Sequence, residues 1–184
     1  QFWEAQIPAK LKGNFHKGNQ TFPVVGDYVT FEYYPNQEAK ILEVCERKSI
    51  LKRPFPRDHA TRKVKEQEMV ANVDYVFIVT SLNDDFSINR VLRYATMAKQ
   101  GGAKPVIILT KADLCENVQE FVKEMEMEIS DMPIHVVSAV EGLGIDDLQN
   151  YMQPGNTIAL MGSSGVGKST LINKLAGKEL MKTN

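Results

Sequence analysis

The sequence has 184 residues, of which 43% are hydrophobic, and its 22 Lys and Arg are balanced by 23 Asp and Glu. This length and apolar content are sufficient for a packed core in one ordinary domain or two small ones. The near-neutral net charge excludes a strongly basic protein that attracts polyanions over its whole surface. Any site for phosphate or nucleic acid must therefore be local.

Cysteine usage and hydropathy exclude further classes of protein. Cys45 and Cys115 lie far apart in the chain, and neither has a neighbour at the spacing of a zinc site or a disulfide framework. No apolar run approaches the roughly 20 residues of a membrane span, and no charged-then-apolar leader comes first. We therefore expect a soluble, cytoplasmic protein with no membrane contact.

Residues 1–50 have the composition of short strands. Three segments rich in β-branched and aromatic residues are separated by turn signals, and they are Gln6 to Leu11, Pro23 to Tyr33 and Ala39 to Glu46. They predict an all-β domain, a small barrel. Its aromatic residues are available for stacking on bases, although alternation places Phe31 and Tyr33 on one face and we expect most of them in the core.

The stretch that follows is strongly basic. Arg47 to Lys65 contains eight basic residues and the single acid Asp58, with two prolines that disfavour a helix. We predict a basic linker over residues 51–70. Its candidate RNA contacts are Arg53, Arg57, Arg62 and Lys63.

Residues 71–184 alternate between apolar runs and segments of helical period. The runs are Val73 to Thr80, Pro105 to Thr110, Ile134 to Ser138 and Asn156 to Met161, and such continuous runs are typical of parallel strands buried on both faces. Ser87 and Asn117 stand where helix N-caps are expected. The pattern predicts an α/β domain with a doubly wound parallel sheet and ligands at the carboxyl ends of its strands.

A phosphate-loop pattern, G-x-x-x-x-G-K-[ST], lies between the last apolar run and a helical segment. Its glycines let backbone N–H groups surround phosphate oxygens, and the helix adds the positive end of its dipole. We predict that Lys168 binds the β and γ phosphates and that Ser169 binds Mg²⁺, as the two catalytic residues. The predicted nucleotide contacts here are Gly162, Ser163, Ser164, Gly165, Val166, Gly167, Lys168, Ser169 and Thr170.

Two further motifs predict which base is bound. Thr110-Lys111-Ala112-Asp113 follows an apolar run, and a carboxylate such as Asp113 accepts hydrogen bonds from N1 and N2 of guanine, which adenine cannot donate. The stem of Lys111 can lie along the purine face. Ser138-Ala139 ends the next run and can direct a backbone amide at guanine O6. Each of these two motifs alone is weak, but together with the phosphate loop, at the carboxyl ends of three strands, they predict a guanine-nucleotide site.

The three motifs resemble those of P-loop GTPases, in a rotated order, because the phosphate loop comes last instead of first. This circularly permuted order, together with the β-rich start, resembles the ribosome small-subunit-dependent GTPase A family (RsgA, also called YjeQ or YloQ). Other stretches agree with that family, namely Pro23-Val-Val-Gly-Asp27, Arg47-Lys48, Leu51 to Pro54 and Ala71-Asn-Val-Asp74.

The resemblance implies an OB-fold barrel followed by a GTPase domain, GTP and GDP as ligands, and GTP hydrolysis in late assembly of the small (30S) ribosomal subunit. It also implies contacts with rRNA, and we expect a monomer. The family continues with switch motifs and a zinc-binding C-terminal domain, whereas this sequence stops at Asn184. We therefore expect an incomplete GTPase domain that binds nucleotide and hydrolyses little, with zinc only in the absent domain. Thr110 stands where Asn is commoner, and we expect it to loosen the base-side loop.

Two alternatives stay open at this point. The chain could be a P-loop ATPase or kinase in which residues 110–113 form an ordinary loop, and competition between GTP and ATP separates these readings. It could also be an RNA-binding module on a degenerate GTPase scaffold, against which the intact phosphate loop argues.

Overall fold

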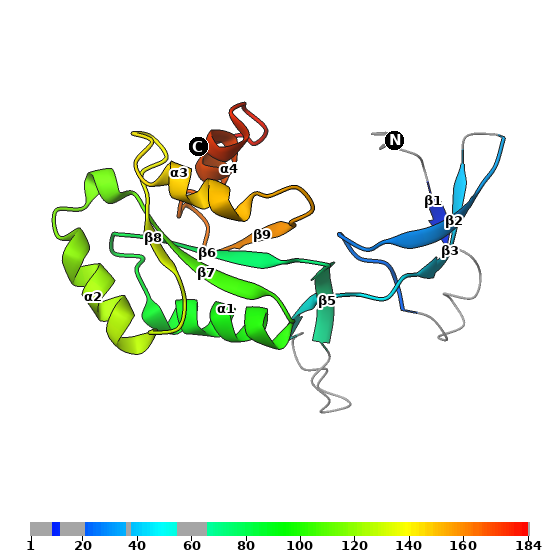
Figure 1. The fold of residues 1–184 in the computed structure, drawn as a ribbon, viewed down its shortest axis with the longest axis horizontal. Helices are drawn as coiled ribbons and strands as arrows, with labels where there is room; N and C mark the ends of the chain where they lie inside the picture. Colours follow the sequence, from blue (N-terminus) through cyan, green and yellow to red (C-terminus); the bar gives the residue numbers. More distant parts are fainter. Residues whose placement is uncertain (1–8, 12–20, 36–37, 55–65, 184) are drawn as a thin grey trace. The chain divides into compact units, whose positions relative to one another are not determined.

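The computed structural model describes residues 9–11, 21–35, 38–54 and 66–183 (Figure 1). The chain divides into two compact units, residues 1–72 and residues 73–184. The predicted contacts Arg57, Arg62 and Lys63 lie outside the described residues.

The first unit is a β structure in its described part. Strands β1 (Ala9–Leu11), β2 (Val29–Tyr33) and β3 (Ala39–Val44) form a sheet of order β1-β3-β2, with β3 parallel to β1 and antiparallel to β2. The pairings among the residues described do not close into a barrel, so the OB fold stays a prediction. The expectation of mostly buried aromatics is wrong for this part, because Tyr28, Phe31 and Tyr33 are each more than half exposed.

The two ends of the predicted linker are strands. β4 (Ile50–Pro54) and β5 (Glu66–Ala71) pair antiparallel, and Lys52 lies across from Glu68 in the register. The Lys52 ammonium is 3.6 Å from the Glu66 carboxylate and 3.9 Å from that of Glu68. Opposite charges that face one another across the two strands stabilise this pair. A prediction based on the alternation of apolar residues does not detect strands of this kind.

A buried ion pair organises the first unit. Arg47 Nε and Nη2 donate to the two carboxylate oxygens of Asp27, both at 2.7 Å, and Nη1 donates to Glu68 at 2.8 Å. The Asp27 side chain is only 1% exposed. Burial alone would raise the pKa of Asp27, but hydrogen bonds from Arg47 and from the Val24 amide outweigh it, and the pKa is lowered. The neighbouring Gly26 approaches the Ala71 carbonyl so closely that a Cβ there would lie 2.2 Å from the oxygen.

The second unit contains the predicted parallel sheet, which is confirmed. Its strand order is β8-β7-β6-β9, and every pairing is parallel. The strands are β6 (Tyr75–Ser81), β7 (Lys104–Thr110), β8 (Ile134–Val136) and β9 (Ile158–Met161). The apolar runs predicted all four, because parallel strands covered on both faces carry apolar side chains on both.

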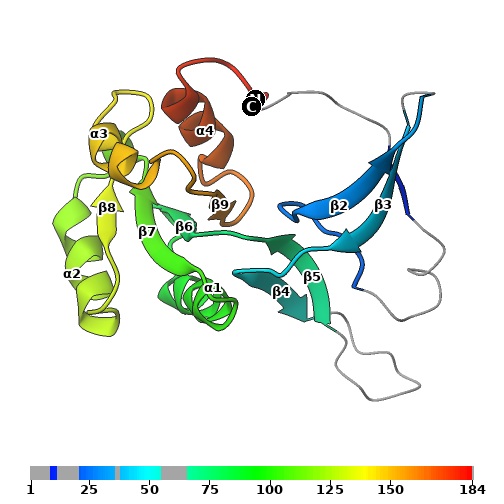
Figure 2. The same cartoon turned by 45° about the vertical axis from the view of Figure 1, so that its right-hand side comes forward.

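Helices cover both faces of this sheet. They are α1 (Ile88–Gln100), α2 (Val118–Glu128), α3 (Ile145–Leu148) and α4 (Lys168–Ala176), with 3-10 turns η2 (Ala112–Leu114) and η3 (Gln149–Tyr151). Figures 1 and 2 show α1 and α2 on one face and α3 and α4 on the other. No helix in the described ranges has the combined length and apolarity of a membrane span.

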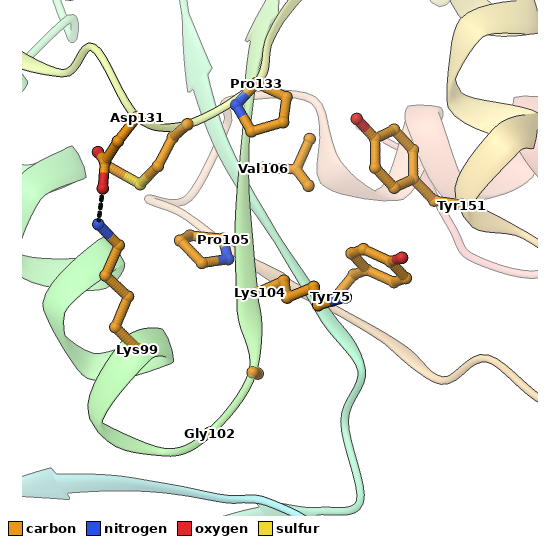
Figure 3. A pocket seen from close by; sticks show the side chains of 11 residues that line it. Tyr75, Lys99, Gly102, Lys104, Pro105, Val106, Asp131, Pro133 and Tyr151 are labelled. Atoms are coloured by element: carbon orange, nitrogen blue, oxygen red, sulfur yellow. Dashed lines mark hydrogen bonds and ion pairs between the residues drawn. The ribbon is translucent and has the colours of Figure 1, made fainter.

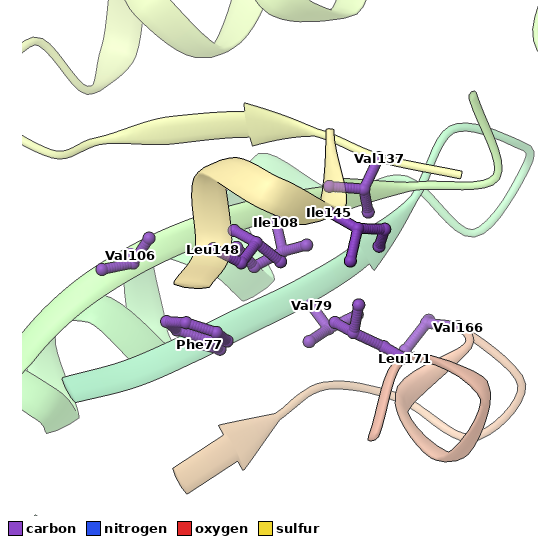
Figure 4. Close-up of a cluster of buried hydrophobic side chains, with 9 residues drawn as sticks. All are labelled: Phe77, Val79, Val106, Ile108, Val137, Ile145, Leu148, Val166 and Leu171. Atoms are coloured by element: carbon purple, nitrogen blue, oxygen red, sulfur yellow. The ribbon is translucent and has the colours of Figure 1, made fainter. Parts of the chain in front are cut away.

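The core under α3 and α4 also anchors the loop that precedes α4. Phe77 and Val79 of β6 pack with side chains of β7, α3 and α4, as Figure 4 shows. Val166, from the predicted phosphate loop, and Leu171, from α4, are 1% and 0% exposed in this cluster. Truncating a buried leucine of this kind to alanine costs about 2 to 5 kcal/mol. The loop is therefore held in place by the same apolar packing that stabilises the sheet.

Candidate functional site

The predicted phosphate loop connects β9 to α4 at the carboxyl edge of the parallel sheet. Gly162 begins the loop, and a Cβ there would lie 2.2 Å from the Val79 carbonyl oxygen of β6. Gly165 and Gly167 have φ values of +80° and +95°, in the left-handed region that other residues rarely adopt. Glycine is thus required at Gly162 by close contact with the sheet and at the other two positions by the turn.

A cavity of about 210 Å³ lies at this loop. Loop residues, the first turn of α4 and two residues beyond the helix line it, namely Ser164, Gly165, Gly167, Lys168, Ser169, Thr170, Lys182 and Thr183. The Lys168 ammonium donates to the carbonyls of Gly162, at 2.9 Å, and of Ser163. The structure therefore brings the predicted phosphate and magnesium ligands, Lys168 and Ser169, to one pocket at the start of a helix.

Thr110 joins the base-side motif to the phosphate loop. It ends β7, is 3% exposed, and its hydroxyl donates to the Val166 carbonyl at 2.6 Å. Its own carbonyl accepts from the Leu82 amide at 3.0 Å. The hydroxyl is thus long enough to reach the adjacent phosphate loop from this strand end. The expectation that Thr110, in place of Asn, loosens the base-side loop stays a prediction.

The rest of the base-side motif turns sharply after β7. Lys111 has φ +60°, and the Ala112 amide donates to the Val137 carbonyl at 3.3 Å. Asp113 follows in η2 and is exposed. The carboxylate that is predicted to accept from guanine thus lies at the carboxyl edge of the sheet, accessible to a ligand.

The Ser138-Ala139 motif forms a compact turn just after β8. Ser138 is 1% exposed, and its hydroxyl accepts from the Glu141 amide at 3.2 Å. The Ser138 amide donates to Leu143 and its carbonyl accepts from Gly142, at 3.0 and 2.8 Å. Ala139 packs against the core cluster. These contacts fix the tight backbone that the sequence predicted at this position.

An arginine that the sequence analysis did not select also reaches the phosphate loop. Arg90, on α1, donates from Nη1 to both carboxylate oxygens of Asp85, at 3.0 and 2.9 Å, and to the Ser163 hydroxyl. The hydrogen bond from Arg90 lowers the pKa of Asp85. Their position in the sequence could have identified Asp85 and Arg90, because both follow the carboxyl end of β6, where this fold places ligand contacts.

The opposite edge of the sheet holds a second cavity, of about 470 Å³ (Figure 3). It lies at the amino ends of β6 and β7, where Tyr75 and Tyr151 meet edge to face and Lys99 pairs with Asp131 at 2.6 Å. None of the three sequence motifs contributes to it. Within the described ranges, no group of three or more His, Cys, Asp and Glu side chains is arranged to hold a metal.

The fold and the carboxyl-edge site define a P-loop nucleotide-binding protein of permuted order, since β7 and its base-side loop precede β9 and the phosphate loop. The family model described as RsgA GTPase matches residues 44–184. The chain belongs to the RsgA GTPase family.

Curated relatives agree along nearly the whole chain. The small ribosomal subunit biogenesis GTPase RsgA 2 of Listeria monocytogenes is 43% identical over 181 residues, which are 98% of this chain and 49% of the relative. The small ribosomal subunit biogenesis GTPase RsgA of Methanosarcina acetivorans is 39% identical over 97% of this chain and 47% of the relative. The chain thus spans about half the length of the curated relatives it matches.

Two solved structures are similar. YjeQ from Thermotoga maritima has a TM-score of 0.72 and 31% identity over 96% of this chain and 59% of that one. YloQ, a circularly permuted GTPase, has a TM-score of 0.58 over 90% of this chain and 54% of that one. At 24% identity, this second likeness supports the fold alone.

Proposed function

We propose that this chain binds GTP and GDP at the carboxyl edge of its parallel sheet, and that the protein hydrolyses GTP during maturation of the small (30S) ribosomal subunit. The observation that carries the nucleotide site is the bond from the Thr110 hydroxyl to Val166, which joins the base-side motif to the phosphate loop. The printed names of the relatives, small ribosomal subunit biogenesis GTPases, support the reaction and the partner.

The residues of the site suit a guanine nucleotide and Mg²⁺. Glycines at the loop leave backbone amides accessible to phosphate oxygens, and Lys168 adds a charge at the same pocket. Ser169 offers a hydroxyl to Mg²⁺, which when bound neutralises charge on the phosphates. Asp113 accepts hydrogen bonds from the base, and the tight turn at Ser138-Ala139 offers one backbone amide to guanine O6. These contacts bind and orient the nucleotide.

We also propose that the first unit binds rRNA through an OB-fold barrel and its basic stretch. Arg53 lies on β4 and donates from Nε to Gln67 at 2.9 Å, which leaves its other donors for phosphate. The exposed rings of Tyr28, Phe31 and Tyr33 suit base stacking. Arg57, Arg62 and Lys63 extend the same charge. We further propose a cytoplasmic monomer, with zinc confined to a C-terminal domain of the family.

Calorimetric titration with GTP, GDP and ATP tests the nucleotide site. We expect guanine nucleotides to bind, ATP to fail, and Lys168→Ala to weaken binding at least about tenfold, because charge-assisted contacts are worth roughly 1.5 to 3 kcal/mol. GTP hydrolysis, measured with and without small ribosomal subunits, tests the reaction. A preference for ATP would favour an ATPase or kinase instead.

A further inference from the structure

The residues that follow α4 return toward the helix. We call residues 177–183 the tail segment. α4 ends at Ala176, and Gly177 follows it with a φ of +64°, the left-handed conformation that reverses a chain after a helix. Asn173 of α4 then binds the tail segment three times. Its Oδ1 accepts from the amides of Leu180 and Met181, both at 2.8 Å, and its Nδ2 donates to the Met181 carbonyl at 2.7 Å.

The three bonds use both ends of one amide side chain. An aspartate could accept from the two backbone amides but could not donate to the Met181 carbonyl, and an alanine could do neither. The path of the tail segment therefore depends on one glycine and one asparagine.

This path brings Lys182 to the phosphate pocket. Lys182 and Thr183 line the 210 Å³ cavity together with the loop and the first turn of α4. Lys182 is exposed, and in the part of the chain that the structure describes it has no ion-pair partner. Its charge is therefore available to a ligand. Lys168 lines the same cavity, so two lysines contribute to the lining of one space of about 210 Å³.

We infer that Lys182 is a second phosphate-binding cation of the nucleotide site and that Asn173 is the positioning residue that keeps Lys182 there. The inference rests on the proposed function, because it adds residues to the same site. The ligand chemistry is a nucleoside di- or triphosphate, whose charge is only partly matched by Lys168 and the backbone amides. An exposed ammonium adds a modest contact to such a ligand, because water and salt screen it.

The first test compares two lysines of the tail segment. Lys182→Ala should weaken binding of GTP and GDP roughly three- to tenfold by calorimetry at low salt. Lys178→Ala removes the same charge from the same segment, but Lys178 does not line the cavity. The affinity of the Lys178→Ala variant for GTP and GDP should therefore match that of the parent. Equal affinities for Lys182→Ala and the parent, or an equal loss in Lys178→Ala, would overturn the role of Lys182.

The second test addresses Asn173. If Asn173 acts through Lys182, then Asn173→Ala and Lys182→Ala together should weaken binding no more than the stronger single change. Additive losses would overturn the positioning role. Asn173→Asp, which keeps two of the three bonds, should lose less than Asn173→Ala and serves as the second variant if the alanine does not fold.

A readout without nucleotide completes the test. Hydrogen exchange at the Leu180 and Met181 amides should be at least about tenfold faster in Asn173→Ala than in the parent, while exchange at buried Leu171 stays unchanged. Unchanged exchange at the two tail amides would overturn the assignment of Asn173. If the parent protein binds neither GTP nor GDP, the proposed function itself is contradicted. If the parent protein binds them and Lys182→Ala binds them equally well, only this inference is overturned.

Discussion

The hydroxyl of Thr110 donates a hydrogen bond of 2.6 Å to the carbonyl oxygen of Val166. Thr110 is the last residue of β7, and Val166 lies inside the phosphate loop. Both are buried, at 3% and 1% exposure, so water cannot replace the donor if the hydroxyl is removed. The two loops that we propose bind opposite ends of a nucleotide are therefore held to each other by a buried hydrogen bond.

Thr110→Val tests this arrangement, because it keeps the shape of the side chain and removes the donor. The unsatisfied carbonyl should cost about 1 to 3 kcal/mol. We expect affinity for GTP and GDP to fall roughly tenfold, since the loop is no longer fixed before binding. Thr110→Ser restores the hydroxyl and should bind within about threefold of the parent. Calorimetry measures the affinity of the three proteins for GTP and GDP. Equal affinities of the valine and serine variants would contradict the role of the hydrogen bond.

Asp113→Asn tests the identity of the base. The new amide presents a donor to the guanine amine, which leaves polar groups unpaired at a cost of roughly 1 to 3 kcal/mol. Affinity for GTP and GDP should fall about ten- to a hundredfold. Xanthosine nucleotides, which carry a carbonyl in place of that amine, should gain affinity, while ATP stays excluded. A variant that still prefers guanine in nucleotide titrations would refute the assignment of residues 110–113.

Arg90→Ala should weaken nucleotide binding modestly, by roughly three- to fivefold, because Ser163 loses the donor that holds it on the α1 side of the phosphate loop. Arg93→Ala, on the same helix, removes an equal charge and is the matched control. Titrations with GDP measure both. Indistinguishable affinities for Arg90→Ala, Arg93→Ala and the parent would show that the Ser163 contact does not contribute.

The buried pair of Arg47 and Asp27 predicts a pH dependence of stability. The pKa of Asp27 is lower in the folded chain than its unfolded value of about 3.9, so the folded state binds fewer protons between the two values. The stabilisation is complete above the unfolded pKa and is lost as the pH falls through the folded one. Asp27→Asn should cost about 3 kcal/mol in urea unfolding at pH 7. This difference from the parent should shrink below about pH 4, and a constant difference would contradict the prediction.

Replacing Arg53, Arg57, Arg62 and Lys63 together by alanine should weaken binding to small-subunit rRNA. Each lost phosphate contact removes about one unit from the slope of log affinity against log salt. Filter binding over a salt series measures this slope, and GTP affinity serves as the control for folding. If the slope is unchanged, the basic stretch does not contact phosphates.

The motifs were predictable because they depend on local pattern. Apolar runs before Thr110, Ser138 and Gly162 indicated strands, and parallel strands bring their carboxyl ends to one edge of a sheet. The placement of the three motifs at one edge of the sheet therefore followed from the order of the runs and the residues that end them, even though the phosphate loop comes last.

Contacts between distant segments were not predictable in this way. Arg90 and Ser163 are 73 positions apart and meet only because α1 starts beside the phosphate loop. In the sequence, Asn173 is one polar residue of a helical segment, and nothing in the local pattern predicts that the tail segment binds it. The charged strands β4 and β5 were not predicted from the sequence, because cross-strand charge pairs and the Arg47 network stabilise them. Neither kind of contact leaves an apolar period in the sequence.

Gly162 and Gly165 belong to one motif but face different constraints. A side chain at Gly162 would meet the Val79 carbonyl at 2.2 Å, whereas a Cβ at Gly165 would have no heavy atom within 4 Å. Any substitution at Gly162 must therefore push β9 away from β6, with or without ligand. A substitution library sorted only for protein abundance should consequently lose nearly every variant at Gly162. It should retain more at Gly165, where the only structural cost is the left-handed backbone at φ +80°, about 1 to 2 kcal/mol for a residue with a side chain. The same library sorted for nucleotide binding should lose both, so comparing the two sorts would separate the architectural glycine from the ligand-facing one.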